Sequence, residues 1–394
     1  MNARSQQSVA LCVGIAVALA TLAGPARTAA PSPVSRAGQS GVTSLTAPTV
    51  QPGRRPAASS KARLSGSVQF TPARRGRPVV IQRRVAGGTW KQVARKRQND
   101  AGAVNFTGPA SARRQPYVYR GVAVRWQGLR KQAASPQSAA VWSEAFTDEF
   151  AGRKLGPGWA DRKSDSASRK CSKVGDRRAS QVRRGTLRLR VMVNPDRRGD
   201  ICRIRRGPDK GSYQYYLNGQ VSTQHVPHAF TFGTFAARMK FPRTRGQHGA
   251  FWLQPMSPQY LEGRPGLSGA EIDIAEFFGQ GYPEGGFASF LYNYGIDAGT
   301  TKIGGLAPSA TRMLPRGDAW WTRYHVFSLE WNKRAYIFRV DGREHWRTRR
   351  GVSRIDEYLI LSLLSSDWEL RQAKQFGFRP GGTMHVDWVR VWQK

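Results

Sequence analysis

The chain has 394 residues and carries 63 Lys and Arg against 25 Asp and Glu, a formal net charge of +38. Its length allows two domains and a sizeable hydrophobic core. So strong a positive field attracts polyanions such as nucleic acids and anionic polysaccharides. The basic residues are scattered and no nucleic-acid-binding motif appears. We therefore expect no specific nucleic-acid partner and only non-specific attraction to anionic cell-surface polymers.

The first 30 residues have the features of a secretory signal peptide. Arg4 precedes an apolar run over residues 9–22, and small residues follow as far as Ala30. A basic start, a short apolar run and a small-residue cleavage site, here near Ala26 or Ala30, are typical of such signals. The apolar run is too short and too rich in Ala to predict a membrane span, and no other segment predicts one. We expect a secreted, soluble monomer.

The cysteines predict one disulfide. Cys12 would leave with the signal peptide, so Cys171 and Cys202 remain as a pair. In an oxidising compartment they can form a disulfide that contributes about 3–4 kcal/mol for a loop of this size. Two unrelated thiols are the alternative. No Cys-x-x-Cys or His-x-x-x-His pattern lies nearby to favour a zinc site.

The first part of the mature chain predicts a small accessory module between two linkers. Residues 31–60 are rich in Pro, Ser, Ala, Gly and Thr, which predicts a disordered linker. Over residues 61–131, short alternating apolar segments are separated by turn residues, the pattern of a small β-sandwich. This stretch resembles the immunoglobulin-like modules that accompany secreted bacterial enzymes. Residues 132–143 are expected to form a second linker.

The remaining part, residues 144–394, predicts a larger β domain. Its segments alternate or run apolar, aromatic residues are frequent, and helical periodicity is nearly absent. A two-sheet jelly roll whose concave sheet is wide enough for a polymer fits this pattern. The predicted fold class is therefore all-β: a β-jelly-roll domain preceded by a small β-sandwich.

Three carboxylates lie within residues 271–276, which read EIDIAE. The isoleucines alternate with the first two acids, which predicts a strand with acids on one face. Glu276 is out of phase, and a β-bulge near Ile274 or Ala275 would return it to that face. Glu271 and Glu276 would then lie about four strand steps apart, ~13 Å between Cα atoms. Leaning side chains on a curved sheet can close this gap to roughly 5–6 Å, and about 5–5.5 Å suits a retaining glycosidase.

A solvated strand face and a calcium site are two other interpretations of the triplet. No Lys or Arg occurs between Gly266 and Pro283 to offset the repulsion among the acids. A flat strand rarely wraps the six to eight oxygens that calcium takes. We therefore favour catalysis, with Asp273 placed where its charge or hydrogen bond raises the pKa of the catalytic acid.

The region also resembles family 16 of the glycoside hydrolases, in its bulged-motif, laminarinase-like branch. Residues 271–276 look like the active-site signature of that family, and further segments agree in order and spacing. These segments are residues 146–152, 232–242, 250–254, 325–331, 338–342 and 384–391. The resemblance spans nearly all of residues 145–394. It implies a jelly roll with an open cleft and cleavage of internal β-1,3 or β-1,4 linkages of glucans or galactans.

The resemblance also implies roles for individual residues. Glu271 would be the nucleophile, Glu276 the acid/base and Asp273 their assistant. Trp252 would stack on a sugar ring in the cleft, with a plain core Trp as the alternative. Trp368 is a second candidate for substrate contact, or else packs a loop. We expect no cofactor and no metal ion among the site residues. Members of the family often hold a calcium ion far from the cleft, and Asp387 stands where one ligand would be.

Two segments depart from the β-1,3-glucanase pattern and leave the substrate open. The β-1,3-glucanases that this region resembles have a Trp-Pro-x-x-Gly pattern before the first Glu, whereas residues 264–270 here lack the Trp. Residues 365–369 stand where many relatives have a small Gly-rich turn. We expect a secreted, retaining, endo-acting hydrolase of a β-1,3-glucan. The alternatives are a transglycosylase, a hydrolase of a galactan or acidic polysaccharide, and a non-catalytic carbohydrate-binding protein.

Overall fold

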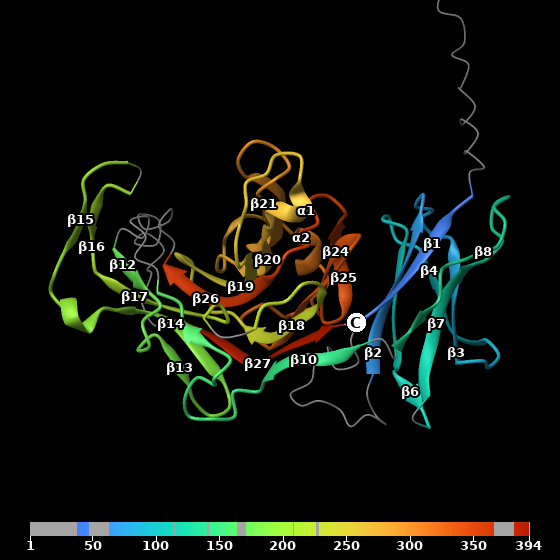
Figure 1. Ribbon diagram of the computed structural model, residues 1–394, viewed down its shortest axis with the longest axis horizontal. Coiled ribbons are helices and arrows are strands. Elements are labelled where there is room, and N and C mark those ends of the chain that lie inside the picture. The colour runs from blue at the N-terminus through green and yellow to red at the C-terminus, as the bar shows by residue number, and fades with distance from the viewer. Residues whose placement is uncertain are drawn as a thin grey trace, which may run out of the picture. The chain divides into compact units, whose positions relative to one another are not determined.

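The computed structural model describes residues 38–46, 63–113, 115–139, 142–163, 171–207, 209–225, 228–365 and 382–393. The expected signal peptide lies outside these ranges. Nearly all regular elements here are strands, and the helices are single turns such as α1 (Pro265–Ser268) and α2 (Pro308–Thr311) (Figure 1). No helix in the described part of the chain is long and apolar enough to span a membrane. The predicted all-β fold class is confirmed.

The N-terminal module consists of two sheets that share one core. One sheet has the strand order β1-β2-β5, and the other has the order β4-β3-β7-β6, with β8 and β9 also paired to β7. Val68 and Phe106 of the first sheet meet Ile81 and Tyr119 of the second in a common cluster of buried side chains. The bounds are β1 Ser40–Leu45, β2 Arg63–Thr71, β3 Pro78–Val85, β4 Lys91–Arg97, β5 Ala103–Pro109, β6 Ser111–Ala112, β7 Gln115–Ala123, β8 Gln132–Ala133 and β9 Gln137–Ser138. The immunoglobulin-like character of this module remains a prediction.

Both stretches expected to be linkers contain strands, which corrects that expectation. Within the expected linker 31–60, β1 pairs antiparallel with β2, whereas residues 31–37 and 47–60 lie outside the described residues. Within the expected linker 132–143, β8 and β9 pair with β7. These strands are short and polar, so pairing with a neighbouring strand, which composition does not reveal, decides their conformation.

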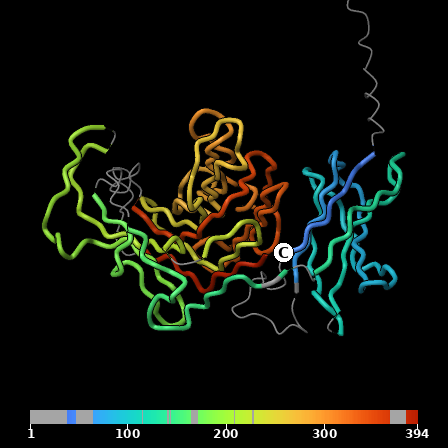
Figure 2. Tube along the Cα trace, in the orientation of Figure 1, coloured from blue at the N-terminus to red at the C-terminus, as the bar shows by residue number. Residues whose placement is uncertain are grey.

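The larger domain is a single curled sheet of sixteen strands (Figure 1). Its main path is β22-β21-β20-β19-β26-β17-β14-β27-β18-β23-β24-β25, so the C-terminal β27 lies between strands from the middle of the chain (Figure 2). The bounds are β10 Ser143–Asp148, β11 Ala160–Asp161, β12 Ser172–Val174, β13 Ser180–Val182, β14 Leu187–Val193, β17 Tyr216–Ser222, β18 Gly233–Lys240, β19 Gln247–Pro255, β20 Ala270–Phe277, β21 Phe287–Asn293, β22 Thr301–Leu306, β23 His325–Asn332, β24 Ala335–Val340, β25 Arg343–Thr348, β26 Glu357–Ser365 and β27 Thr383–Gln393. A separate hairpin joins β15 (Cys202–Ile204) to β16 (Gly211–Tyr213).

The two halves of this path fold over one aromatic and aliphatic core, as in a jelly roll. Phe287 of β21 and Phe327 of β23 come from opposite halves, and their ring centroids are 5.5 Å apart. In β19, Phe251 and Leu253 are fully buried in this core. Because successive side chains of a strand alternate, Trp252 and its neighbours in phase point to the other face. That outer face of β19, β20 and β26 is where the carboxylates lie.

Cys171 and Cys202 form the predicted disulfide. Their Cα atoms are 5.8 Å apart, within the range that disulfides require. The bond joins the start of β12 to the first residue of β15. It therefore ties the β15–β16 hairpin back to the main sheet.

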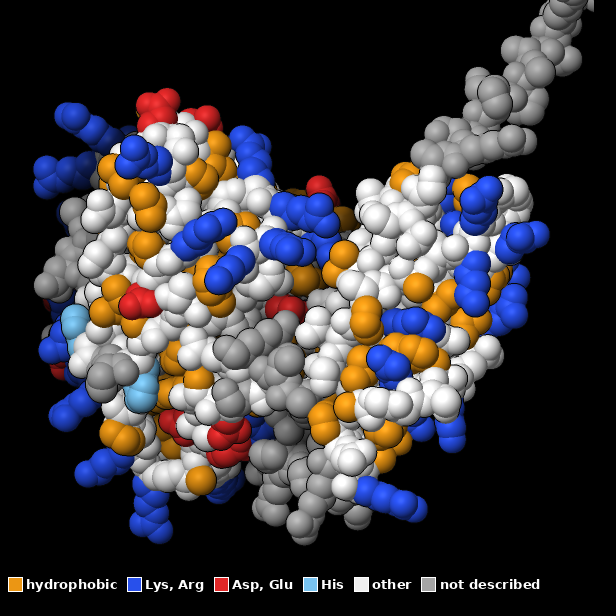
Figure 3. All heavy atoms as spheres, turned by 45° about the vertical axis from the view of Figure 1, so that its right-hand side comes forward, with side chains coloured by type: hydrophobic (Ala, Val, Ile, Leu, Met, Phe, Trp, Pro, Cys, Tyr) orange, Lys and Arg blue, Asp and Glu red, His pale blue; other side chains and the backbone are white. Residues whose placement is uncertain are grey.

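The surface is strongly basic. In Figure 3, Lys and Arg side chains are spread over the visible face, and Asp and Glu side chains are few. Strand β4 is an example, since Lys91, Arg95, Lys96 and Arg97 are all exposed along the edge of its sheet. Edge strands rich in Lys and Arg resist pairing with other chains.

Glu357, the first residue of β26, is a buried carboxyl in the core of the larger domain. Its side chain is fully buried, and burial raises its pKa to about 8. The folded state therefore holds this proton more tightly than the unfolded chain. Its contribution to stability is complete below pH ~4.5 and is lost as pH rises through about 8.

We expect Glu357→Gln to remove this pH dependence. Between pH 5 and pH 8.5 the melting temperature of wild type should fall more than that of the variant. Only wild type has a buried carboxyl at residue 357 whose ionisation opposes folding. Thermal unfolding followed by circular dichroism at the two pH values measures the difference. The exposed Glu284→Gln serves as the matched control and should track wild type. An equal change in melting temperature between the two pH values for wild type and Glu357→Gln would contradict the raised pKa of Glu357.

Candidate active site

Strand β20 carries the three carboxylates and contains the predicted bulge. Asp273 pairs with Phe290 of β21, and the next pairing is Glu276 with Ala288. Two residues of β20 therefore stand where β21 has only one, which is the definition of a bulge. Because Phe290 and Ala288 are two apart, they share a face of β21. Asp273 and Glu276 consequently share a face of β20, and Glu271 shares it by alternation.

The carboxylates are largely removed from water. Asp273 is 2% exposed and Glu276 is 9% exposed. Burial raises the pKa of Asp273 well above its usual range, and the charges of Glu276 and Glu271 raise it further. Burial also raises the pKa of Glu271, although a hydrogen bond and a nearby cation oppose this. Because three crowded carboxyls in a low dielectric repel one another when ionised, the ionisation of each one opposes that of the others.

A hydrogen-bonded set of polar side chains surrounds Glu271. Gln254 of β19 donates from Nε2 to Oε2 of Glu271 over 2.7 Å. The amide oxygen of Gln254 accepts from Arg162 over 2.8 Å and from the hydroxyl of Tyr358 over 2.9 Å. Arg162 also donates to that hydroxyl over 3.2 Å. Gln254 of β19 is therefore the direct partner of the carboxylate, and Arg162, which follows β11, and Tyr358 of β26 hold its amide from the other side.

Trp252 lies on the carboxylate face and is partly exposed. It pairs with Asp273 in the β19–β20 register, and its Nε1 donates to Oγ of Ser362 over 3.1 Å. The guanidinium of Arg162 lies 5.7 Å from its ring centroid. The structure therefore places Trp252 beside the carboxylates and outside the core, and its contact with a sugar remains a prediction.

The opposite flank of β20 is aromatic and carries a cation. Lys302 of β22 is exposed, and its Nζ lies 4.3 Å from the ring centroid of Phe290 and 5.4 Å from that of Tyr292. Its charge partly opposes the rise in the pKa of Asp273. Arg162 and Lys302 thus stand on opposite sides of β20.

Sequence reasoning did not identify the groups that flank the carboxylates. Gln254 was within reach, because it is two residues from Trp252 and must share its face. Arg162 follows β11, distant in sequence from the motif, and no pattern around it signals the contact. Trp368, the other predicted substrate contact, lies outside the described residues.

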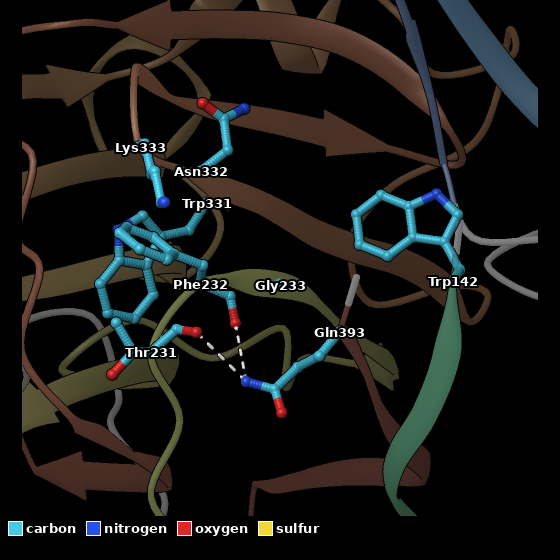
Figure 4. A pocket seen from close by; sticks show the side chains of 8 residues that line it. All are labelled: Trp142, Thr231, Phe232, Gly233, Trp331, Asn332, Lys333 and Gln393. Carbon is cyan, nitrogen blue, oxygen red and sulfur yellow. Dashed lines mark hydrogen bonds between the residues drawn. The ribbon is translucent and has the colours of Figure 1, made fainter. Parts of the chain in front are cut away.

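Within the described ranges, no group of three or more His, Cys, Asp or Glu is arranged to hold a metal ion. A separate pocket of about 380 Å³ lies where β18 begins and β23 and β27 end. Figure 4 shows Trp142 on one side of it and Trp331 with Phe232 on the other. Gln393 closes its floor by donating to the backbone carbonyl of Phe232 over 3.3 Å. No acidic side chain lines this pocket, so it offers no acid/base pair.

A jelly roll that gathers carboxylates on one face of a bulged strand has the fold and the acidic groups of a carboxylate-based glycosidase. The chain belongs to glycosyl hydrolases family 16, whose model matches residues 188–390. That match includes the whole of β20. The family predicted from the sequence is therefore confirmed.

The individual proteins that the chain matches share little of its sequence. The chain is 26% identical over 205 residues to glucan endo-1,3-beta-glucosidase A1 of Niallia circulans, which covers 47% of this chain and 28% of that protein. The chain thus spans less than a third of that relative. The endo-β-1,3-glucanase of Pyrococcus furiosus is 20% identical, with a TM-score of 0.47, over 64% of this chain and 94% of that one. Porphyranase B of Zobellia galactanivorans is also 20% identical, with a TM-score of 0.47, over 64% and 92% of the two chains.

Proposed function

We propose that the protein is a secreted, endo-acting glycosidase that cleaves internal β-linkages of a polysaccharide with retention of configuration. The observation that carries this proposal is the bulge in β20, which gathers Glu271, Asp273 and Glu276 on one largely buried face. A strand that only bound neutral sugar would gain nothing from mutually repelling acids, which cost stability when buried. Membership of family 16 and the endo-1,3-glucosidase relative favour a β-1,3-glucan as substrate.

The first chemical step is the attack of Glu271 on the anomeric carbon. As the glycosidic C–O bond breaks, Glu276 transfers its proton to the leaving oxygen, and a covalent glycosyl ester remains on Glu271. Asp273 lies between the two in the strand, and burial together with the charges of Glu276 and Glu271 raises its pKa well above its usual range, which favours the protonated form. A protonated Asp273 limits the negative charge of the site and can donate a hydrogen bond to a neighbouring carboxylate.

The second step returns the enzyme to its starting state. Glu276, now a carboxylate, takes a proton from water while the water oxygen bonds to the anomeric carbon. The ester bond to Glu271 breaks and its electrons return to the carboxylate. One water is consumed, and two inversions give net retention.

Release of reducing ends from a panel of polysaccharides tests the proposed function. The panel contains β-1,3-glucan, mixed-linkage β-glucan, neutral galactan and sulfated galactan. We expect short oligosaccharides to appear early from β-1,3-glucan, as endo-cleavage requires. Arg162 and Lys302 flank the carboxylates with positive charge, which favours a galactan with anionic groups as the second candidate. Binding without reducing-end release on every member would instead identify a carbohydrate-binding protein.

We also propose that the basic N-terminal module holds the enzyme on anionic polymers. Its sheet carries guanidinium groups fixed over aromatic rings: Arg84 lies 4.6 Å and Arg120 lies 4.1 Å from the ring centroid of Trp90. The single acid of the expected module, Asp100, is already paired with Arg75 over 3.1 Å. The other basic residues of the module therefore have no carboxylate within residues 61–131 to pair with.

We expect replacement of Lys91, Arg95, Lys96 and Arg97 by Gln to weaken retention on an anionic polysaccharide column at 0.1 M salt. The difference should vanish at 1 M salt, where the Debye length falls to ~3 Å. A variant with the exposed residues Arg153, Lys154, Arg203 and Arg206 of the larger domain changed to Gln has the same net charge. Equal elution of the two variants would show that only net charge matters, contrary to a role for the module.

A further inference from the structure

The amide of Gln254 has only one orientation that satisfies its neighbours. Arg162 can donate hydrogen bonds and cannot accept them, so the atom of Gln254 that faces it must be the carbonyl oxygen. That contact is 2.8 Å long. The NH2 group of Gln254 must therefore face Glu271, which it reaches over 2.7 Å. Without Arg162, the amide could turn over and accept a hydrogen bond from a protonated Glu271, whereas with Arg162 in place it can only donate to Glu271.

A donor aimed at a carboxylate favours its ionised form, because a protonated oxygen accepts a weaker bond. Glu271 needs this help, since burial alone raises its pKa. The hydrogen bond from Gln254 and the positive charge of Arg162 both lower it. Arg162 thus acts on Glu271 in two ways, through its charge and through the orientation of Gln254.

Arg162 is itself held in place on several sides. Its backbone N–H donates to the carbonyl of Gln220 over 3.0 Å, and the Gln220 side chain donates to the Arg162 carbonyl over 3.1 Å. Its guanidinium lies 5.7 Å from the Trp252 ring centroid and 5.8 Å from that of Tyr358. Because Arg162 is anchored in this way, little side-chain entropy is lost when its guanidinium interacts with Gln254 and Glu271.

The other polar and titratable groups near Glu271 do not replace Arg162. Asp273 and Glu276 share its strand and repel its charge, and the tyrosines on β21 and β26 carry no positive charge. The cation Lys302 acts on Asp273, on the far side of the catalytic strand. The groups that face or influence Glu271 from its own and neighbouring strands are Arg162, Gln254, Asp273, Tyr292, Tyr294 and Tyr358, and Glu276 lies on the same face of β20.

We propose that Arg162 is a positioning residue that fixes the Gln254 amide and thereby holds the carboxylate of Glu271 ionised and correctly aimed. This inference rests on the proposed role of Glu271 as nucleophile. Arg162 itself does not react in either step. Its contribution is to prepare the nucleophile before substrate arrives, which is how preorganised sites lower a barrier.

The test is a direct titration of Glu271 in the free protein by carbon NMR of labelled glutamate side chains, with Glu271→Gln to assign the signal. Arg162→Met should raise the pKa of Glu271 by about one unit. Arg162→Lys keeps the charge but loses the planar fork, so a smaller rise is expected. Gln254→Met should also raise the pKa, and it serves as the second variant if Arg162→Met does not fold.

Lys163→Met is the matched control, because it removes one positive charge from the next residue, whose side chain is exposed. It should leave the pKa of Glu271 and the rate unchanged. In Arg162→Met the acidic limb of the pH profile of kcat/KM should move to higher pH together with the NMR titration, and kcat should fall about tenfold or more.

The titration needs no substrate, so it distinguishes failure of the proposed function from failure of the role of Arg162. Wild type without activity on any glycan would overturn the proposed function alone. An active wild type with the same Glu271 titration in Arg162→Met, Gln254→Met and Lys163→Met would overturn the role of Arg162.

Discussion

Glu271→Gln is expected to abolish turnover while leaving the fold intact. The substitution keeps the side-chain volume and a hydrogen-bonding partner for Gln254, but an amide cannot form the glycosyl ester. We expect kcat on the true substrate to fall by about 10³-fold or more, as when other covalent nucleophiles are removed. Initial rates of reducing-end release measure the loss.

Two controls make that result specific. Thermal unfolding of Glu271→Gln should match wild type or exceed it, because the change removes one of three repelling acids from a buried face. Glu284→Gln changes an exposed carboxylate and should keep full activity. Near-normal turnover by Glu271→Gln would mean that another group is the nucleophile.

The fold and the catalytic strand were predictable because both follow from local periodicity. The alternation in residues 271–276 breaks at Glu276, and a break of one residue in a two-residue repeat has the bulge as its simplest cause. The disulfide was predictable for a different reason, since Cys171 and Cys202 are the only cysteines outside the expected signal peptide. In each case the evidence lay within a short stretch or a simple count.

The surroundings of Glu271 were not predictable, because they depend on strand pairing between distant segments. Gln254 and Tyr358 become neighbours through the β19–β26 register. Arg162 arrives through the pairing of β11 with β17, because β11 is a two-residue strand that no propensity signals. The expected linkers failed for the same reason, as β1, β8 and β9 are strands only because β2 and β7 pair with them. Long-range pairing, not local preference, therefore decides the electrostatics of this site.

Removal of the acid/base, Glu276→Ala, is expected to separate the two chemical steps. Cleavage of the native polysaccharide needs a proton on the leaving oxygen, so its rate should fall by about 10²–10⁴-fold. An aryl glycoside with a good leaving group needs no such proton and should still form the glycosyl ester on Glu271. Hydrolysis of that ester then lacks a general base and becomes slow.

Azide should rescue the variant, because it is a small nucleophile that needs no base and fits the space left by the missing side chain. It attacks the glycosyl ester from the face that water uses, so proton NMR should show a β-glycosyl azide with the configuration of the substrate. Glu262→Ala, an exposed carboxylate outside β20, is the control and should show neither loss nor rescue. An α-glycosyl azide would mean a single displacement, and hence a wider gap between the two carboxylates than the bulge in β20 provides.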